Sequence, residues 1–193
     1  MERTTLILAA GSSSRMGTSG DKLLEKINNT PLLAIITQRA MAASDRVYVC
    51  LPGPSHPRAQ LVQPEQAIWV SEAHEGMGAT IRTGIGALPA ASDVMILPAD
   101  MPELTEQDLA SVWGAHEEGA ITRGASAAGR AGHPVIFPQD LLRELLELRG
   151  DEGARQVIVR HRHRLHLVPL PAEHALTDLD TPQAWAAWRA QQG

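Results

Sequence analysis

A stretch near the start of the chain combines many small residues with two cations. Residues 6–24 read LILAAGSSSRMGTSGDKLL, so an apolar run leads into Gly11, three serines, Arg15 and Lys22. Small residues allow a backbone to approach a ligand closely and to turn its N–H groups toward it. A guanidinium can bind two phosphate oxygens at once, and a lysine adds a mobile point charge. The stretch therefore predicts a polyphosphate site, and the alternative is a surface loop with two solvated cations.

Three aspartates offer carboxylates for a cation or for a helix cap. Asp100 ends the apolar run DVMILPAD. A carboxylate just beyond a buried strand lies at the edge of a sheet where ligands bind, although aspartate is also common in turns. Asp178 and Asp180 belong to the segment DLDTP, where alternation along an extended backbone sends both side chains to one face. Either of them can instead cap the helix that follows, so both uses stay open.

The third chemical feature is a glycine-rich turn that opens a predicted helix. Residues 76–80 read GMGAT, so the hydroxyl of Thr80 follows two glycines. Backbone groups in such a turn, with this hydroxyl, can bind the polar edge of a ligand. The hydroxyl can equally cap its own helix, and one threonine can serve both purposes.

These residues need a sheet that holds them at one edge. Apolar runs rich in Val, Ile and Leu predict strands at 4–10, 46–51, 67–71, 93–99, 132–137 and 164–170. Helical patterns lie between the runs or follow them, at 31–43, 105–113, 140–148 and from 181 onward. Alternating strands and helices predict an α/β fold with a mostly parallel sheet covered on both faces, a three-layer arrangement. Because the 193 residues contain no repeat or convincing linker, we expect a single domain over 1–193.

Composition excludes several classes of partner. The formal net charge is −5, from 17 Lys and Arg against 22 Asp and Glu, and a nucleic-acid surface is usually basic. One cysteine cannot form an intramolecular disulfide and fits a reducing compartment. The chain shows neither a signal peptide nor an apolar stretch of about 20 residues. We therefore expect a cytoplasmic protein without a nucleic-acid or membrane partner.

Two common phosphate-binding motifs do not match. A P-loop needs Gly-Lys-Ser/Thr after its second glycine, whereas Gly17 is followed by Thr18. The dinucleotide fingerprint G-x-G-x-x-G fails at Ser13, and the nearest match elsewhere, GMGATI, has Ile81 in place of the third glycine.

LAAGSSSRMG followed by a lysine resembles the signature of the GT-A-like nucleotidyltransferases, specifically the molybdenum cofactor cytidylyltransferase family within the MobA-like NTP transferase superfamily. The resemblance continues along almost the whole chain. The further matching segments, in order, are EGMGATIRTGI, ILPADMP, GHPVIF, GDEGAR and DLDTP. Two details depart from the family pattern: the gap between Gly17 and Lys22 is longer than usual, and Thr80 stands where serine is frequent.

The resemblance implies a Rossmann-like, GT-A-type domain with a Mg²⁺ ion. Arg15, Lys22 and Asp100 would be the catalytic residues. The implied metal ligands are Asp100 and Asp180, with Asp178 as the second choice after Asp180. His133, Asp151 and Arg155 would contact the second substrate. The residues implied to bind the nucleotide are Leu8, Ala9, Ala10, Gly11, Ser12, Arg15, Lys22, Gly76, Met77, Gly78 and Thr80.

The implied reaction is transfer of CMP from CTP to the phosphate of molybdopterin or the molybdenum cofactor, with release of pyrophosphate. Ala10 distinguishes the cytidylyl type, LAAG, from the guanylyl type, LAGG. The alternatives are a guanylyltransferase for the same cofactor, another NTP as donor, and a sugar-phosphate or polyol-phosphate nucleotidyltransferase. A delivery chaperone without catalysis is the alternative from another class. A molybdoenzyme or its maturation factor would be a further partner.

Overall fold

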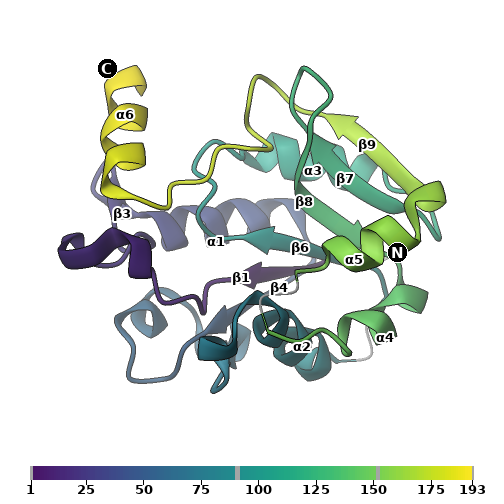
Figure 1. Ribbon diagram of the computed structural model, residues 1–193, viewed down its shortest axis with the longest axis horizontal. Helices are drawn as coiled ribbons and strands as arrows, with labels where there is room; N and C mark the ends of the chain where they lie inside the picture. The colour runs from purple at the N-terminus through teal and green to yellow at the C-terminus, as the bar shows by residue number, and fades with distance from the viewer. Residues whose placement is uncertain (1, 90–91, 151–152, 193) are drawn as a thin grey trace.

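The computed structural model describes residues 2–89, 92–150 and 153–192. Within them, one seven-stranded sheet has the order β5-β4-β1-β6-β8-β7-β9 (Figure 1). The strands are β1 Thr4–Leu8, β4 Arg46–Leu51, β5 Ala67–Trp69, β6 Val94–Pro98, β7 Ile121–Ala125, β8 Ala131–Phe137 and β9 Leu165–Pro169. Only β8 is antiparallel to its two neighbours in this sheet, which confirms the predicted α/β class with a mostly parallel sheet.

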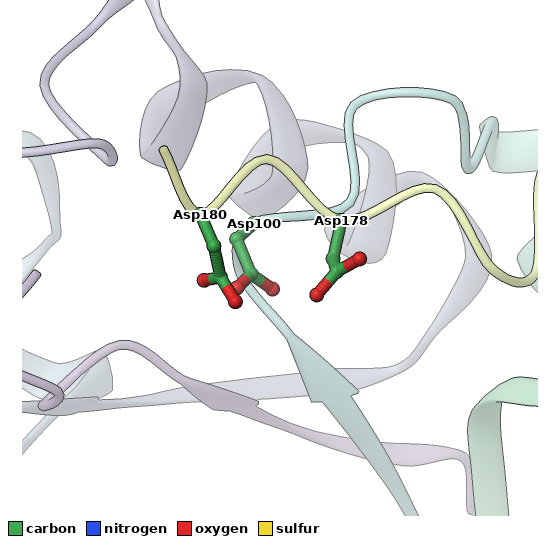
Figure 2. Close-up of side chains that lie close together, drawn as sticks. All are labelled: Asp100, Asp178 and Asp180. Carbon is green, nitrogen blue, oxygen red and sulfur yellow. The ribbon is translucent and has the colours of Figure 1, made fainter. Parts of the chain in front are cut away.

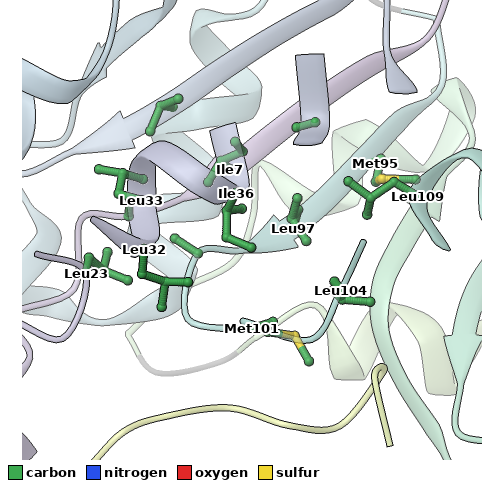
Figure 3. Packing of buried hydrophobic residues seen from close by; sticks show 14 of the residues in the cluster. Ile7, Leu23, Leu32, Leu33, Ile36, Met95, Leu97, Met101, Leu104 and Leu109 are labelled. Atoms are coloured by element: carbon green, nitrogen blue, oxygen red, sulfur yellow. The ribbon is translucent and has the colours of Figure 1, made fainter. Parts of the chain in front are cut away.

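Two apolar clusters pack against opposite faces of the sheet. Alternation along β1 sends Ile7 to one face and Leu6 to the other, and both are fully buried. The first cluster includes residues of α1 and α3, and the second includes residues of α2, α4 and α5 (Figures 1 and 3). The helices are α1 Leu32–Ala43, α2 Met77–Ala87, α3 Glu106–Gly114, α4 Leu142–Leu145, α5 Arg155–Arg160 and α6 Pro182–Gln192. The predicted three layers are therefore present.

Capping residues set the start of two helices. Thr105 and Asp108 form a reciprocal capping box at α3. The hydroxyl of Thr181 accepts a hydrogen bond from the backbone N–H of Ala184 at 3.1 Å, which caps α6. The cap at α6 matters for the site because it leaves the neighbouring Asp180 free for other partners.

Two parts of the fold differ from the sequence prediction. Strand β7 was not predicted, because Arg123 and Gly124 interrupt its apolar pattern. The leucine-rich run at 140–148 forms a short 3₁₀ turn and a helix of four residues instead of one long helix. Its leucines at 141, 145 and 148 are nevertheless buried, so the pattern indicates burial correctly and helix length incorrectly. Strands β2 Lys26–Ile27 and β3 Thr30–Pro31 add a small hairpin.

Helices of the described residues are all too short or too polar to cross a membrane.

Strand β8 lies close to the segment around residue 175, and Gly132 makes this approach possible. The backbone N–H of His133 donates to the carbonyl oxygen of Ala175 at 2.8 Å. A Cβ atom at Gly132 would lie 2.0 Å from that oxygen and 2.6 Å from its carbon. The glycine therefore allows the chain before α6 to pack against β8.

We predict that Gly132→Ala lowers the free energy of unfolding by about 3 kcal/mol or more, since the clash is with backbone atoms and exceeds ordinary overpacking. Gly114→Ala is the matched control, because a Cβ atom added there would have no atom within 4 Å, and it should change stability by less than about 1 kcal/mol. Urea unfolding of both variants measures the difference. Equal losses in the two variants would contradict the steric explanation.

Candidate active site

A cavity of about 720 Å³ opens beside the carboxyl ends of β1 and β6. Parallel strands carry their ligands at this edge, so the loop after β1 and the turn after β6 face the same space. Most of the residues predicted to bind the nucleotide line it: Leu8, Ala9, Ala10, Gly11, Ser12, Arg15, Lys22, Gly76, Met77 and Thr80. Gly78 does not line the cavity, because it lies inside α2, where its N–H donates to the carbonyl of Gly150 at 2.9 Å.

Three carboxylates meet at one side of this cavity (Figure 2). Asp100, Asp178 and Asp180 each bring an oxygen within 4.8 Å of the others. The backbone holds the two segments together, since the N–H of Leu179 donates to the carbonyl of Asp100 at 3.1 Å. The alternation between residues 178 and 180 therefore sends both side chains to the face that Asp100 occupies, as the sequence predicts.

Two cations of the first loop neutralise these carboxylates. The Lys22 ammonium donates to Asp100 at 2.5 Å and also to Asp180. The Arg15 guanidinium pairs with the other oxygen of Asp180 at 2.5 Å, although the Arg15 side chain is 71% exposed. The long gap before Lys22 thus does not prevent it from reaching the site.

The charges of this cluster raise the pKa values of Lys22 and Asp178 and lower that of Asp180. Burial acts against the charge of Lys22, but Asp100 and Asp180 outweigh it and raise the pKa of Lys22. Burial likewise opposes the charge of Asp180, but its contacts with Lys22 and Arg15 hold its pKa below the usual value. The pKa of Asp178 is raised by burial and then by the charges of Asp180 and Asp100. An additional cation near Asp178 would therefore offset the repulsion from its two neighbouring carboxylates.

The donor set fits a hard divalent cation. All three groups offer carboxylate oxygens, which are the ligands that Mg²⁺ and similar ions prefer. Asp100 and Asp180 are largely buried, whereas Asp178 is more exposed, and all three are close enough to share one ion. Thr80 faces the same cavity, and its hydroxyl donates to the carbonyl of Gly76 at 3.5 Å. It does not cap α2, because the residue at the N-cap position is Gly76 and Thr80 lies within the first turn.

A second cavity of about 460 Å³ adjoins the first, and the two share five lining residues: Leu8, Met77, Arg123, Ala131 and His133. Its floor is apolar, and it is also lined by Arg155 and by Arg123 of β7. The guanidinium of Arg123 donates to the carbonyl of Gly132 at 2.6 Å. Burial and then the charge of Arg155 lower the pKa of Arg123, so two cations face this cavity.

Arg123 was not predicted as a site residue, because it lies on the strand that was not predicted. Residues 121–125 read ITRGA, which is neither a continuous apolar run nor an alternation of apolar and polar residues, so the local sequence carries no strand signal there. His133 and Arg155 lie at the second cavity, whereas Asp151 lies outside the described residues.

His133 is held in its neutral form. Burial and then the charge of Arg123 lower the pKa of His133 to about 4, against a smaller opposing effect of Asp100. Its Nδ1 atom is buried and has no hydrogen-bond partner among the described residues. The imidazole therefore carries no charge near neutral pH.

This pKa predicts a loss of stability in acid. The unfolded chain protonates His133 below about pH 6.5 and the folded protein only below about pH 4, so stability falls as the pH drops between these values. The free energy of unfolding of the wild type should fall by about 2 kcal/mol more than that of His133→Gln between pH 7 and pH 4.5. Urea unfolding at several pH values measures it, and parallel losses would contradict the assigned pKa.

Comparisons with known proteins show the family and the fold of the chain. Residues 5–165 match the family described as the MobA-like NTP transferase domain. A curated relative from Synechococcus elongatus, named probable molybdenum cofactor guanylyltransferase, is 37% identical over 107 residues, which cover 54% of this chain and 53% of that protein. A relative of the same name from Nostoc sp. is 25% identical over 185 residues, covering 93% of this chain and 87% of that protein. The first alignment thus spans about half the length of the relative.

Solved structures show the same fold. The crystal structure of Rv0371c from Mycobacterium tuberculosis H37Rv has a TM-score of 0.82 and 23% identity, and covers 100% of this chain and 99% of that one. A structure of the same protein in complex with manganese has a TM-score of 0.77 and 21% identity, and covers 97% of each chain. The Rossmann-like α/β arrangement expected from the resemblance is therefore confirmed. With the family match extending over most of its length, the chain belongs to the MobA-like NTP transferase family.

Proposed function

We propose that the protein transfers a nucleotidyl group from a nucleoside triphosphate, CTP, to the phosphate of molybdopterin or the molybdenum cofactor. One observation carries this proposal: a loop of small residues, its two cations and three carboxylates converge on one cavity. The names of the curated relatives support the acceptor. We further propose that residues 1–193 act as one domain and work in the cytoplasm.

A divalent metal would be held by Asp100 with Asp180 and Asp178, and Mg²⁺ is our choice. The oxygen donors of the three side chains support a hard cation, and the manganese complex of Rv0371c is consistent with one. When bound, the ion would supply positive charge to the α-phosphate and help to orient it. Arg15 and Lys22 would bind the β- and γ-phosphates. The negative charge of these phosphates would then replace part of the carboxylate charge that the two cations contact in this structure.

The chain's own residues would act mainly by position and charge. An oxygen of the acceptor phosphate attacks the α-phosphorus, the bond from that phosphorus to the bridging oxygen of the β-phosphate breaks, and pyrophosphate leaves with that electron pair. The acceptor phosphate is already an anion, so the step needs no strong general base. A neutral His133 is consistent with this, because its pKa of about 4 makes it a weak base. Preorganised positive charge from Arg15 and Lys22 would then stabilise the leaving pyrophosphate.

The second cavity is our proposed acceptor site. Its apolar side chains, including Ile81 and Phe137, suit a flat ring, and Arg123 and Arg155 suit a phosphate. Its continuity with the first cavity would allow the two phosphates to meet. His133 lies on the boundary, where it can contact either substrate. Asp151 remains part of this proposal through the family resemblance alone.

GTP is a second candidate donor, because the two curated relatives described above are named molybdenum cofactor guanylyltransferases. Ala10, which is buried and lines the cavity, favours CTP through its likeness to the cytidylyl type. Two alternatives to this function are transfer to a sugar-phosphate or polyol-phosphate acceptor and delivery of the cofactor by a chaperone without catalysis. A molybdoenzyme would be a further partner of the proposed enzyme. A screen of pyrophosphate release with four triphosphates and purified molybdopterin tests the function; no release with any of them would reject it.

We predict that CTP gives a higher kcat/KM than GTP when the two compete for the enzyme and molybdopterin. The physical reason is that fixed backbone groups near Ala10 and Met77 distinguish bases by hydrogen-bond pattern. Ala10→Gly alone should not reverse the preference, since other contacts share in the selection. Separate quantification of the two dinucleotide products measures the ratio, and an equal or larger GTP product would reject the cytidylyl assignment.

We predict that Asp100→Asn lowers kcat at least about 100-fold, the effect of losing one preorganised electrostatic contact. Lys22→Ala should weaken triphosphate binding at least about tenfold as well as turnover, because its charge acts in the ground state too. Lys26→Ala is the matched control, since Lys26 is an exposed lysine close in the sequence. Steady-state kinetics and calorimetry with CTP measure both effects. A folded Asp100→Asn protein within about threefold of wild-type kcat would remove Asp100 from the catalytic centre.

A further inference from the structure

Arg58 lies beneath the first loop and is almost completely buried, with 1% of its surface exposed. It belongs to the short 3₁₀ turn Pro57–Leu61, in a proline-rich segment whose sequence predicts a loop. Its guanidinium uses all three nitrogens as donors toward the loop after β1. The acceptors, with their distances, are the carboxylate of Asp21 at 2.7 and 2.6 Å, the carbonyls of Ala9 at 2.6 Å and Gly11 at 2.8 Å, and the hydroxyl of Ser13 at 2.8 Å.

These bonds fix the direction of two peptide groups. In a planar trans peptide, the carbonyl of one residue and the N–H of the next point in opposite directions. Arg58 is not part of the cavity lining, and the carbonyls of Ala9 and Gly11 point toward it. The N–H groups of Ala10 and Ser12 therefore point away from Arg58, on the side where both residues line the cavity. These two N–H groups are therefore available to donate hydrogen bonds to an anion in the cavity.

The same guanidinium supports a strained residue. Ser13 has φ 52° and ψ 29°, the left-handed region that side chains other than glycine seldom adopt. Such a conformation persists where the surroundings determine it more strongly than the local strain opposes it. The hydroxyl of Ser13 accepts a hydrogen bond from Arg58 and donates one to Asp21 at 3.1 Å. Both partners of the buried pair thus hold this one side chain.

The charged groups of Arg58 and Asp21 also have hydrogen-bond partners of their own. Asp21 accepts from the backbone N–H of Leu23 at 3.0 Å in addition to its bonds from Arg58 and Ser13. A buried ion pair often contributes little to stability because desolvation opposes the attraction between its charges. The better-attested use of such a pair is to select one conformation, and five directed bonds from one planar group select the loop conformation strongly.

We propose that Arg58 is a positioning residue, which through Asp21 and Ser13 holds residues 9–13 in the form that binds the triphosphate. This inference rests on the proposed function for the ligand but not for the geometry of the loop. Arg58 itself touches no substrate. A residue that merely stabilised the fold would change the amount of folded protein and leave the affinity of the folded protein for nucleotide unchanged.

Arg58→Lys tests the proposal, because lysine keeps the charge but cannot make the same set of planar, directed bonds. Arg164→Lys is the matched control. Arg164 also forms a two-point pair with a carboxylate, that of Asp140 at 2.8 and 2.8 Å, and donates to the carbonyl of Gly119 at 2.6 Å, away from both cavities. Asp21→Asn is the second variant, which decides the question if Arg58→Lys does not fold.

Calorimetry with CTP and with GTP, in the presence of Mg²⁺, gives the first readout on folded protein. We expect Arg58→Lys to weaken the binding of the preferred triphosphate at least tenfold, about 1.4 kcal/mol, and Arg164→Lys to stay within twofold. Asp21→Asn should weaken binding in the same direction. A folded Arg58→Lys or Asp21→Asn protein that binds within twofold of the wild type overturns the proposal.

Amide hydrogen exchange of the ligand-free protein separates this inference from the proposed function. Exchange over residues 9–16 should become faster in Arg58→Lys and stay unchanged in Arg164→Lys. If the wild type binds neither triphosphate, the proposed function fails, and this exchange result alone decides whether Arg58 holds the loop. Unchanged exchange in Arg58→Lys overturns the positioning role in either case.

Discussion

Repulsion between carboxylates is the constraint on which this site depends. Asp100, Asp178 and Asp180 lie close enough for one oxygen of each to fall within 4.8 Å of the others, and without cations these like charges would repel one another. Lys22 and Arg15 supply that positive charge, and both come from the loop after β1. The proposed phosphate-binding loop and the acidic segments are therefore joined by charge. A triphosphate with a divalent ion carries the same two signs of charge and can replace these pairs.

The order of the strands brings the charged groups together. β1 and β6 are parallel neighbours with Leu8 opposite Pro98, so the loop and the turn that follow them start side by side. The hydrogen bond from Leu179 to the Asp100 carbonyl adds the late segment to the same edge. On the other side, β8 and β7 present His133 and Arg123 to the adjoining cavity. The proposed nucleotide site and the proposed acceptor site thus adjoin each other, as transfer between two phosphates requires.

Much of this arrangement follows from local sequence, and the exceptions have a physical cause. Six apolar runs predict six strands, and the rule that ligands bind at the carboxyl ends of strands predicts that Gly11 and Asp100 share a cavity. Strand β7 is missed because Arg123 and Gly124 break its apolar pattern, although pairing with β8 and β9 stabilises it. Arg58 has no local signature: its partners lie 37 to 49 residues away, and only the folded chain shows that a proline-rich segment supports the loop.

We propose that the two adjoining cavities carry out nucleotidyl transfer to a pterin phosphate. Mass spectrometry of the pterin product, after incubation of the full chain with molybdopterin, CTP and Mg²⁺, tests it most directly, because it separates transfer from hydrolysis of the triphosphate. The account predicts a product that has gained one CMP unit, formed together with pyrophosphate. Recovery of unchanged molybdopterin from folded, nucleotide-binding protein, with CTP and with GTP alike, would contradict it.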